Sequence, residues 1–334
     1  MIRDPQRFHK KAVLCKSLDG PSNLRRETLP DPEPSANEVV VSVEACALNF
    51  FDTLITRGKY QFKPDLPFSP GGEIAGHILK VGSEVDGWDP GDRVTAYIGW
   101  GGAREKAVVS ADRLVSVPPA VSMEAASGTS ITYGTAIHGL RDRAGLQPGE
   151  WVAVLGASGG AGLAAVELAA AMKARVIAVA SSEEKLEVCR RHGAEQTVNY
   201  HTTDLKSALR ELTDGHGVDV VYDCVGGDST EAALRAMAWG GRFLVVGFAS
   251  GDIPKIPLNL LLLKGCAAIG VFWGESVRRD PAGHRANMER VLDWVATGAL
   301  KARVDRTYPL AGAVEALQMI EQRKAVGKIV LTTA

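Results

Sequence analysis

The chain carries almost no excess of charge of either sign. Its 38 Lys and Arg residues against 39 Asp and Glu residues leave a formal net charge of −1. This balance offers no electrostatic basis for binding nucleic acid or an anionic membrane. Uncharged apolar runs are also short, and none reaches the ~20 residues that a membrane-spanning helix needs. We therefore expect a soluble protein that binds small molecules, with no nucleic-acid or membrane partner.

Cysteine is scarce and shows no metal-binding or redox spacing. The five cysteines lie far apart, and no two of them form C-x-x-C. Free thiols in a reducing compartment are the simplest interpretation. Residues 1–7 also lack the apolar core of a signal peptide. Together these absences predict a cytoplasmic location.

The length of 334 residues, 46% of them hydrophobic and 23% charged, suits two ordinary globular domains. Up to about residue 125 the pattern predicts short strands between turns rich in glycine and proline, at residues 38–45, 76–82 and 92–97. Residues 117–122 resemble a boundary that leads into a helical link.

The middle of the chain alternates between strand and helix patterns. Strands are predicted at 151–155, 175–180, 196–200, 218–223, 241–247 and 267–271, and helices at 163–173, 205–212 and 230–238. This alternation predicts a parallel, doubly wound sheet. Helices near 286–297 and 311–322 precede a final strand at 328–332, which we expect to return to the first domain.

The most informative segment is W-V-A-V-L-G-A-S-G-G-A-G-L, residues 151–163. It joins a strand to a helix through a turn that fits A-x-G-x-x-G, with alanine in place of the usual first glycine. A diphosphate is expected to approach the glycine backbone and lie at the helix N-terminus, where free N–H groups favour anions. A glycine-rich turn without a ligand is the alternative. The predicted cofactor-binding residues of the turn are Ala157, Ser158, Gly159, Gly160, Ala161 and Gly162.

The end of the second strand of this unit lacks an acidic residue. NAD sites usually place Asp or Glu there to bind the ribose 2′-hydroxyl. This chain has Ser181 instead, and Lys185 one turn later is within reach of a 2′-phosphate. The pattern favours NADPH over NADH. The alternative is local: Ser181 and Glu184 have capping-box spacing, and Lys185 is then an ordinary solvated helix residue.

Four segments before the glycine turn occur in a characteristic order: A-L-N-F-F-D at 47–52, L-P-F-S-P-G-G-E-I-A-G at 66–76, V-G at 81–82 and P-G-D-R-V at 90–94. Together they resemble the medium-chain dehydrogenase/reductase superfamily, most closely its zinc-free quinone oxidoreductase (ζ-crystallin-like) branch. The resemblance implies an α/β fold. A mainly β, GroES-like catalytic domain, residues 1–126 and 273–334, would be split around a Rossmann NADPH-binding domain, residues 127–272.

The resemblance also implies that no metal is bound. Asn49 stands where the zinc-dependent branch has a cysteine ligand, and Gly72, beside Glu73, stands where it has a histidine. The four-cysteine cluster that binds structural zinc is missing. Zinc requires three or four converging ligands. Cys46, Glu73 and His77 form a tempting set, but we interpret them as a buried thiol and an ordinary histidine.

Without a strong Lewis acid, hydride transfer suits acceptors that are already electron-poor, such as quinones and α,β-unsaturated carbonyls. By resemblance, the residues that line the catalytic cleft are Asn49, Asp52 and Tyr60, and Tyr60 is a candidate proton donor. A second tyrosine of the family is Leu54 here, which puts the identity of the substrate in doubt. The alternatives are structural: Asn49 and Asp52 as turn or helix caps, and Tyr60 as a packed aromatic.

The resemblance supplies further cofactor-binding residues beyond the glycine turn. Lys185, Tyr200 and Arg323 match a cluster around the 2′-phosphate, which guanidinium groups bind well. Phe248 and Phe272 have core packing as the alternative. The complete predicted set outside the turn is Asn49, Thr132, Ser181, Lys185, Tyr200, Val225, Phe248, Phe272 and Arg323.

The sequence thus predicts a zinc-independent, NADPH-dependent enzyme of the NADPH:quinone oxidoreductase type. A 2-enoyl thioester reductase of the same fold and cofactor is the first alternative, and a non-catalytic, crystallin-like NADPH-binding protein is the second. The family implies a dimer or tetramer, and the strand at 267–271 is a candidate for pairing across subunits.

Overall fold

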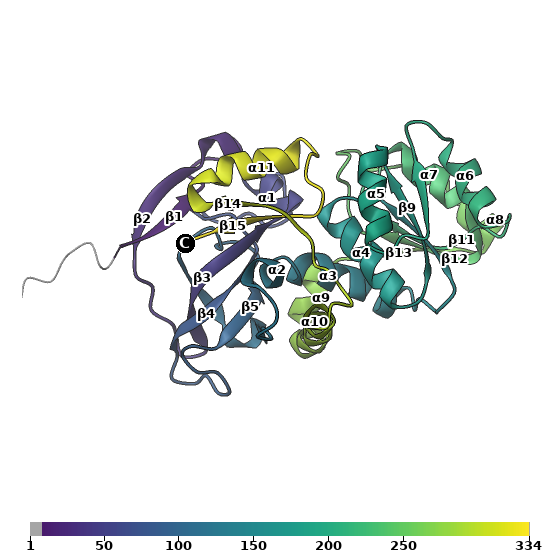
Figure 1. Ribbon diagram of the computed structural model, residues 1–334. Coiled ribbons are helices and arrows are strands. Elements are labelled where there is room, and N and C mark those ends of the chain that lie inside the picture. The colour runs from purple at the N-terminus through teal and green to yellow at the C-terminus, as the bar shows by residue number, and fades with distance from the viewer. Residues whose placement is uncertain (1–8, 334) are drawn as a thin grey trace, which may run out of the picture. The chain divides into compact units, whose positions relative to one another are not determined.

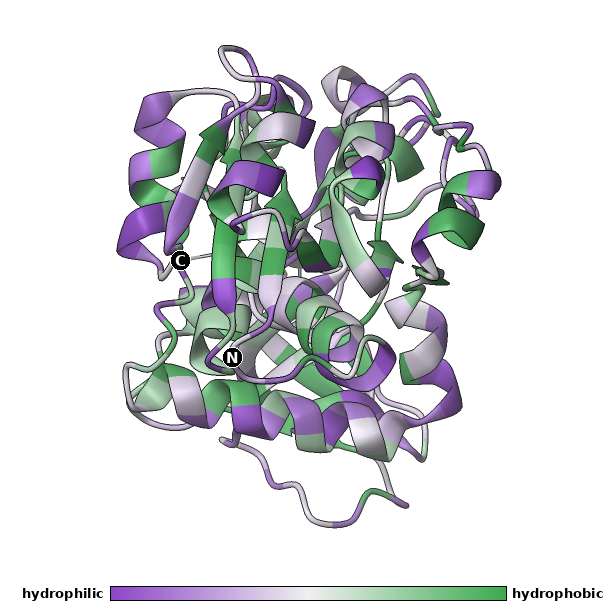
Figure 2. Ribbon diagram, turned by 90° about the vertical axis from the view of Figure 1, so that its right-hand side faces the viewer, coloured by the Kyte–Doolittle hydropathy of each residue, from purple (hydrophilic) through white to green (hydrophobic). Residues whose placement is uncertain are grey.

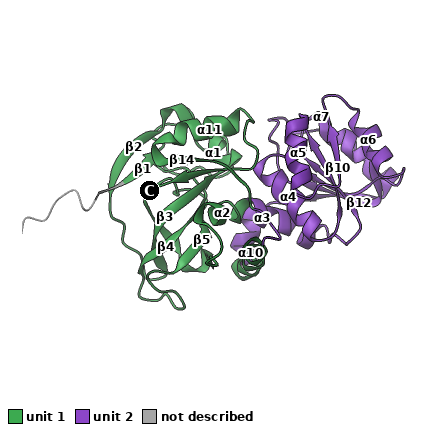
Figure 3. Ribbon diagram, in the orientation of Figure 1, with its two compact units in different colours: residues 1–131, 281–297, 302–334 green, residues 132–280, 298–301 purple. Residues whose placement is uncertain are grey.

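A computed structural model describes residues 9–333, which form two compact units. Unit 1 contains Met1–Ile131, Pro281–Thr297 and Ala302–Ala334, and unit 2 contains Thr132–Asp280 and Gly298–Lys301 (Figure 3). Each unit has its own sheet and its own hydrophobic core.

Unit 1 is built around a long strand, β3 (Glu38–Leu48), whose apolar residues are almost all buried. The seven-stranded sheet has the order β14-β15-β3-β4-β5-β7, and β6 also pairs with β3. A separate antiparallel pair joins β1 (His9–Leu14) to β2 (Arg25–Pro30). The other strands are β4 (Glu73–Val81), β5 (Arg93–Tyr97), β6 (Lys106–Ser110), β7 (Leu114–Ser116), β14 (Val304–Pro309) and β15 (Lys328–Thr332).

The described part of unit 1 contains α1 (Phe50–Ile55), α2 (Met123–Ser127), α10 (Pro281–Ala296) and α11 (Ala313–Glu321). Short 3₁₀ turns lie at Pro21–Asn23, Ala111–Arg113 and Leu310–Gly312. The last strand, β15, pairs with β3 and with β14, so the prediction that it returns to the first domain is confirmed (Figure 1).

Unit 2 contains a six-stranded parallel sheet of order β10-β9-β8-β11-β12-β13. Counted from the first strand of the unit, this is the order 3-2-1-4-5-6 of a doubly wound dinucleotide-binding fold. The predicted α/β class and parallel sheet are therefore confirmed. The strands are β8 (Trp151–Leu155), β9 (Arg175–Ala180), β10 (Gln196–Asn199), β11 (Val218–Asp223), β12 (Met237–Val245) and β13 (Ala267–Gly270).

The helices of unit 2 pack along its strands. α4 contacts β8 and β9, α5 contacts β9 and β10, and α7 contacts β11 and β12. Every residue of β8 is buried, as expected for a parallel strand covered on both faces. In Figure 2 the strands are mainly hydrophobic, whereas the helices around them carry both hydrophobic and hydrophilic residues. The helices are α3 (Ser130–Ile137), which continues as a π-helical turn (His138–Arg143), α4 (Gly160–Ala171), α5 (Glu183–Arg191), α6 (Leu205–Leu212), α7 (Asp228–Arg235), α8 (Asn259–Lys264) and α9 (Trp273–Arg279).

Three predicted boundaries are wrong. The helix expected at 230–238 ends at Arg235, and the strand expected at 241 already begins at Met237. Met237 pairs with Val218 in the sheet, so strand pairing overrides the local helical pattern. The helix expected from residue 286 begins at Pro281, a residue suited to a first helical turn because its missing N–H is not needed there.

Candidate functional site

The glycine turn of unit 2 lies at the carboxyl end of β8, and Gly159 is the N-cap of α4. A Cβ added at Gly162 would lie 2.2 Å from the carbonyl oxygen of Gly156, so only glycine lets the helix pack this close to the turn. A Cβ added at Gly159 would meet only that same oxygen, at 3.6 Å. Because the first N–H groups of a helix have no intrahelical partner, the turn presents donors to an anion.

The end of β11 lies beside this turn, at the point where the strand order reverses. A Cβ added at Gly156 would lie 2.6 Å from Cγ2 of Val225, and the thiol of Cys224 donates to the carbonyl of Leu155 at 3.0 Å. Oδ1 of Asp223 accepts hydrogen bonds from the backbone N–H groups of Val225 and Gly226. These two bonds shape the loop that follows β11. Ligands of open α/β sheets bind at such a reversal.

The ends of β9 and β10 bring three predicted cofactor residues close together. Nζ of Lys185 donates to Oγ of Ser181 at 3.3 Å, and the backbone N–H of Tyr200 donates to the carbonyl of Ala180. The capping-box alternative for Ser181 is wrong, because the N-cap of α5 is Ser182, whose Oγ accepts from the backbone of Lys185. Ser181 therefore does not cap this helix.

The other predicted cofactor residues lie in different surroundings. Thr132 is buried, whereas 51% of Phe272 is exposed. The ring of Phe248 packs near Gly226 in the loop after β11. Arg323 belongs to unit 1, where it follows α11 in a left-handed conformation with φ of 55°. The predicted set is thus divided between the two units.

Unit 1 holds two of the predicted catalytic residues where β3 passes into α1. Asn49 is the N-cap of α1 and Asp52 is its capping-box partner, so the helix-cap interpretation of these two residues is confirmed. Asp52 is fully buried, and its two oxygens accept hydrogen bonds from the backbone N–H groups of Gly71 and Asn49, each at 2.8 Å. Burial raises the pKa of Asp52 to about 7, although the two hydrogen bonds and the charge of Lys328 act in the opposite direction.

A buried network surrounds the carboxamide of Asn49. Its Nδ2 donates to Oε1 of Glu73 at 2.9 Å, and its Oδ1 accepts from Nζ of Lys328 at 2.7 Å. The ammonium of Lys328 also donates to Oε1 of Glu73 at 2.7 Å and to the carbonyl of Leu48 at 3.1 Å. Oε2 of Glu73 accepts from the backbone N–H of Ile131 at 2.7 Å. Every charged atom of the Glu73–Lys328 pair therefore has a partner.

Sheet register brings these residues together from distant parts of the sequence. Ile329 of β15 pairs with Leu48 of β3, and Ala47 of β3 pairs with Glu73 of β4. Lys328 at the start of β15, Glu73 at the start of β4 and Asn49 directly after β3 therefore lie close together. Sequence reasoning missed Lys328; the available signal was a charged residue at the start of the otherwise apolar run I-V-L at 329–331.

Tyr60 stands in an aromatic group of unit 1. Its ring centroid lies 5.3 Å from that of Phe51 and 5.9 Å from that of Phe62. Burial, followed by the charge of Asp52, raises the pKa of Tyr60, so its phenol stays protonated. The pKa of Tyr97 nearby is raised to about 12, mainly by burial and then by Tyr60.

The Glu73–Lys328 pair decides whether this site could bind zinc. An ammonium group already lies 2.7 Å from both Glu73 and Asn49, and Asn49 is a poorer zinc ligand than cysteine. His77 pairs instead with Glu44. Within residues 9–333 no three His, Cys, Asp or Glu side chains gather so as to hold a metal ion. The residues present at this site do not fit zinc.

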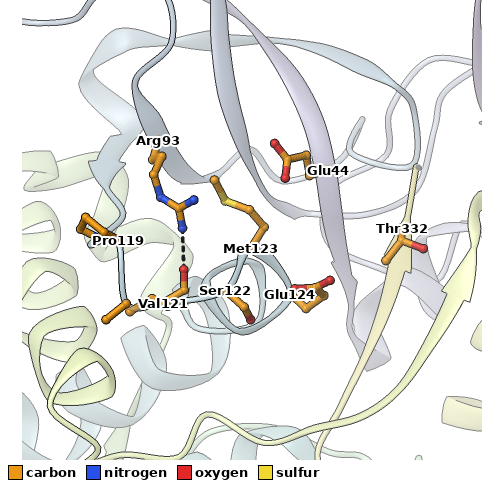
Figure 4. Close-up of a pocket in the computed structure, with 9 residues that line it drawn as sticks. Glu44, Arg93, Pro119, Val121, Ser122, Met123, Glu124 and Thr332 are labelled. Atoms are coloured by element: carbon orange, nitrogen blue, oxygen red, sulfur yellow. Dashed lines mark hydrogen bonds between the residues drawn. The ribbon is translucent and has the colours of Figure 1, made fainter.

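Unit 1 also has an open depression of about 460 Å³, which Figure 4 shows with Arg93 bonded to the carbonyl of Val121. Glu44, Met123 and Thr332 also line it, and none of the predicted site residues does.

Among the described helices, none is long and apolar enough to cross a membrane.

The fold and the turn define a class. A doubly wound parallel sheet with a glycine turn at its reversal point, joined to a mainly β unit, is the architecture of a nucleotide-dependent dehydrogenase. Two family models match the chain, the alcohol dehydrogenase GroES-like domain over residues 35–119 and the zinc-binding dehydrogenase domain over residues 160–297. The chain belongs to the medium-chain dehydrogenase/reductase superfamily, in its quinone oxidoreductase-like branch.

Relatives and solved structures agree with this assignment. Quinone oxidoreductase-like protein 2 homolog from Nematostella vectensis is 41% identical over 97% of this chain and 89% of its own length. The crystal structure of Escherichia coli quinone oxidoreductase complexed with NADPH has a TM-score of 0.88, 29% identity, and coverage of 96% of this chain and 99% of that one. The CurK enoyl reductase structure has a TM-score of 0.87, 27% identity, and coverage of 97% and 99%. The protein is thus an oxidoreductase of this superfamily.

Proposed function

We propose that this protein is a zinc-independent, NADPH-dependent reductase of quinones or other α,β-unsaturated carbonyl compounds. The observation that carries the proposal is the ammonium of Lys328 bound to Glu73 and Asn49, in the neighbourhood where zinc-dependent relatives hold their metal. A site without a Lewis acid suits acceptors that need little activation. The names of the quinone oxidoreductase relatives support the same class of acceptor.

NADPH is the proposed cofactor. The N-terminal N–H groups of α4 are suited to its diphosphate, and Lys185 with Ser181 to its 2′-phosphate. The NADPH complex of the Escherichia coli relative supports this choice. When bound, NADPH supplies the hydride. The chain's own residues bind and orient the two reactants and exclude water from them.

The choice of NADPH is tested at Lys185. Replacing Lys185 with Ala is expected to raise KM for NADPH by about tenfold or more, and KM for NADH by much less, because only NADPH carries the 2′-phosphate. Lys206→Ala removes an exposed lysine of α6 and serves as the matched control, with no change expected. Equal losses for the two cofactors in Lys185→Ala would remove this lysine from the proposed phosphate site.

The polar residues of unit 1 have proposed roles toward the acceptor. Reduction of a conjugated carbonyl leaves an electron pair on its oxygen, which hydrogen-bond donors stabilise. We assign this role to Asn49, and to Tyr60 or solvent the later delivery of a proton. Asp52 holds the backbone of Asn49 in place through its 2.8 Å hydrogen bond.

Purified protein should oxidise NADPH in the presence of 1,2- or 1,4-quinones or enones. Turnover with enoyl-CoA esters but not with quinones would favour the alternative, a 2-enoyl thioester reductase, which the fold of the CurK enoyl reductase supports. Tight NADPH binding without turnover on the whole panel would favour a non-catalytic binding protein. Stoichiometric zinc in metal analysis, with activity lost on chelation, would contradict the zinc-independent mechanism.

We also propose a homodimer that pairs through β13. This strand lies at the edge of the unit 2 sheet, and two copies related by a two-fold axis could pair antiparallel. Trp239 lies in β12, the strand beside β13, and Leu262 lies in α8, which contacts β12. The two side chains are 81% and 79% exposed. Leu262→Glu should yield a monomer in light scattering, whereas Leu18→Glu on unit 1 should not; a monomeric wild type would contradict the proposal.

A further inference from the structure

All three N–H groups of the Lys328 ammonium are engaged. They donate to the carbonyl of Leu48 at 3.1 Å, to Oδ1 of Asn49 at 2.7 Å and to Oε1 of Glu73 at 2.7 Å. Only 5% of Lys328 is exposed and Glu73 is fully buried. A lysine with no remaining donor cannot protonate a substrate, so any role in the reaction must act through its neighbours.

Those neighbours fix the orientation of the Asn49 carboxamide. An ammonium group can only donate, so the atom of Asn49 that faces Lys328 must be the oxygen. A carboxylate can only accept, so the atom that faces Glu73 must be the nitrogen. A flipped amide would place N–H against the ammonium and oxygen against the carboxylate. Two buried charges of opposite sign therefore specify one amide orientation.

This orientation determines what Asn49 presents to a ligand. Its oxygen is occupied by Lys328, and one of its two amide protons by Glu73. The second amide proton has no acceptor within residues 9–333, and the residue is still 9% exposed. Asn49 therefore presents a hydrogen-bond donor and not an acceptor.

We propose that Lys328 is a positioning residue for the reductase reaction, holding the Asn49 carboxamide so that its N–H faces the acceptor's carbonyl oxygen. The inference rests on the reductase activity proposed above. Reduction adds a hydride to carbon and shifts an electron pair onto the carbonyl oxygen, which takes up a proton later. A fixed donor stabilises that oxygen more as its negative charge grows, so it raises kcat and leaves substrate binding almost unchanged.

The surroundings of Lys328 are shaped to keep it in place. A Cβ added at Gly128, the residue that ends α2, would lie 3.1 Å from Cγ of Lys328, so glycine leaves room for the lysine chain. The backbone N–H of Ile131 binds the second oxygen of Glu73 at 2.7 Å and so limits the rotation of its carboxylate. The orientation of Asn49 thus depends on backbone groups at both ends of the network.

The test uses Glu73→Gln combined with Lys328→Met, because removing both charges avoids leaving one of them buried and unpaired. The matched control is Glu150→Gln combined with Arg242→Met, which removes another partly buried ion pair, within unit 2. Both double variants are first checked for folding by circular dichroism and for NADPH affinity by fluorescence titration.

In the Glu73/Lys328 double variant we expect kcat with a quinone to fall by on the order of 10²-fold, with KM and NADPH affinity within about threefold of wild type. The control variant should keep its kcat. Adding Asn49→Ala to the double variant should cause little further loss, because the two changes remove the same interaction. A kcat within threefold of wild type, or losses that add, would overturn the proposal.

A second measurement does not depend on turnover. In ¹⁵N NMR spectra of the protein, the signal that Asn49→Ala removes identifies the carboxamide. Its proton bound to Glu73 should exchange slowly with solvent in the wild type, and about tenfold faster or more in the double variant. Unchanged exchange would overturn the positioning role. A wild type that turns over no acceptor but shows this protection contradicts the proposed function alone.

Discussion

The most quantitative prediction concerns Asp52, a fully buried carboxyl group whose pKa is raised to about 7. Its ordinary value is 3.8, so the folded protein binds a proton here that the unfolded chain releases. The contribution to stability is complete below pH 3.8 and is lost as the pH rises through about 7. Asp52→Asn removes the titration while keeping the shape of the side chain.

The size of the effect follows from the two pKa values. Between pH 5 and pH 8 the difference in proton binding is worth about 2–3 kcal/mol in the free energy of unfolding. Asparagine has only one oxygen for the two backbone donors, the N–H groups of Gly71 and Asn49. Asp52→Asn is therefore also destabilised by about 1–3 kcal/mol, an offset that is the same at every pH.

The assay is urea unfolding of the wild type and of Asp52→Asn at several pH values from 5 to 8. Other carboxyl groups titrate in both proteins, so they cancel in the difference between the two curves. The wild type should lose about 2–3 kcal/mol relative to the variant as the pH rises across this range. Parallel curves would show that Asp52 keeps an ordinary pKa in spite of its burial.

Three further predictions concern packing and hydrogen bonding. Gly162→Ala would place a Cβ 2.2 Å from the oxygen of Gly156, so we expect a loss of about 1–3 kcal/mol in urea unfolding and weaker NADPH binding; unchanged binding would contradict the close approach. Tyr133→Phe removes a 2.6 Å hydrogen bond to buried Glu167 and should cost about 1–3 kcal/mol, and a stability equal to wild type would speak against that bond. Lys328→Met alone should cost about 3–5 kcal/mol, most of it recovered when its carboxylate partner is also neutralised; no recovery would mean that the ion pair is not the cause.

The sequence predicted the architecture of unit 2 because its signals are local. The first strand, Trp151–Leu155, is buried on both faces and is a continuous apolar run, and the turn after it carries glycines where the backbone approaches closely. Gly162, the last glycine of the A-x-G-x-x-G pattern, is the residue at which the structure packs the helix closely against the turn. Boundaries were less predictable: Met237 lies in a strand because Val218 is beside it, which no local pattern reveals.

The candidate site of unit 1 was predicted only in part, and for the same reason. The sequence by itself determined the fold class, the glycine turn and the presence of Asn49 and Asp52 in a family-like motif. Only the tertiary structure determined that Lys328 and Glu73 meet at Asn49, since strand register joins residues 255 positions apart. Burial also arises only when the sheet is assembled. It raises the pKa of Asp52 to about 7, and it holds the Lys328 ammonium against the amide oxygen of Asn49.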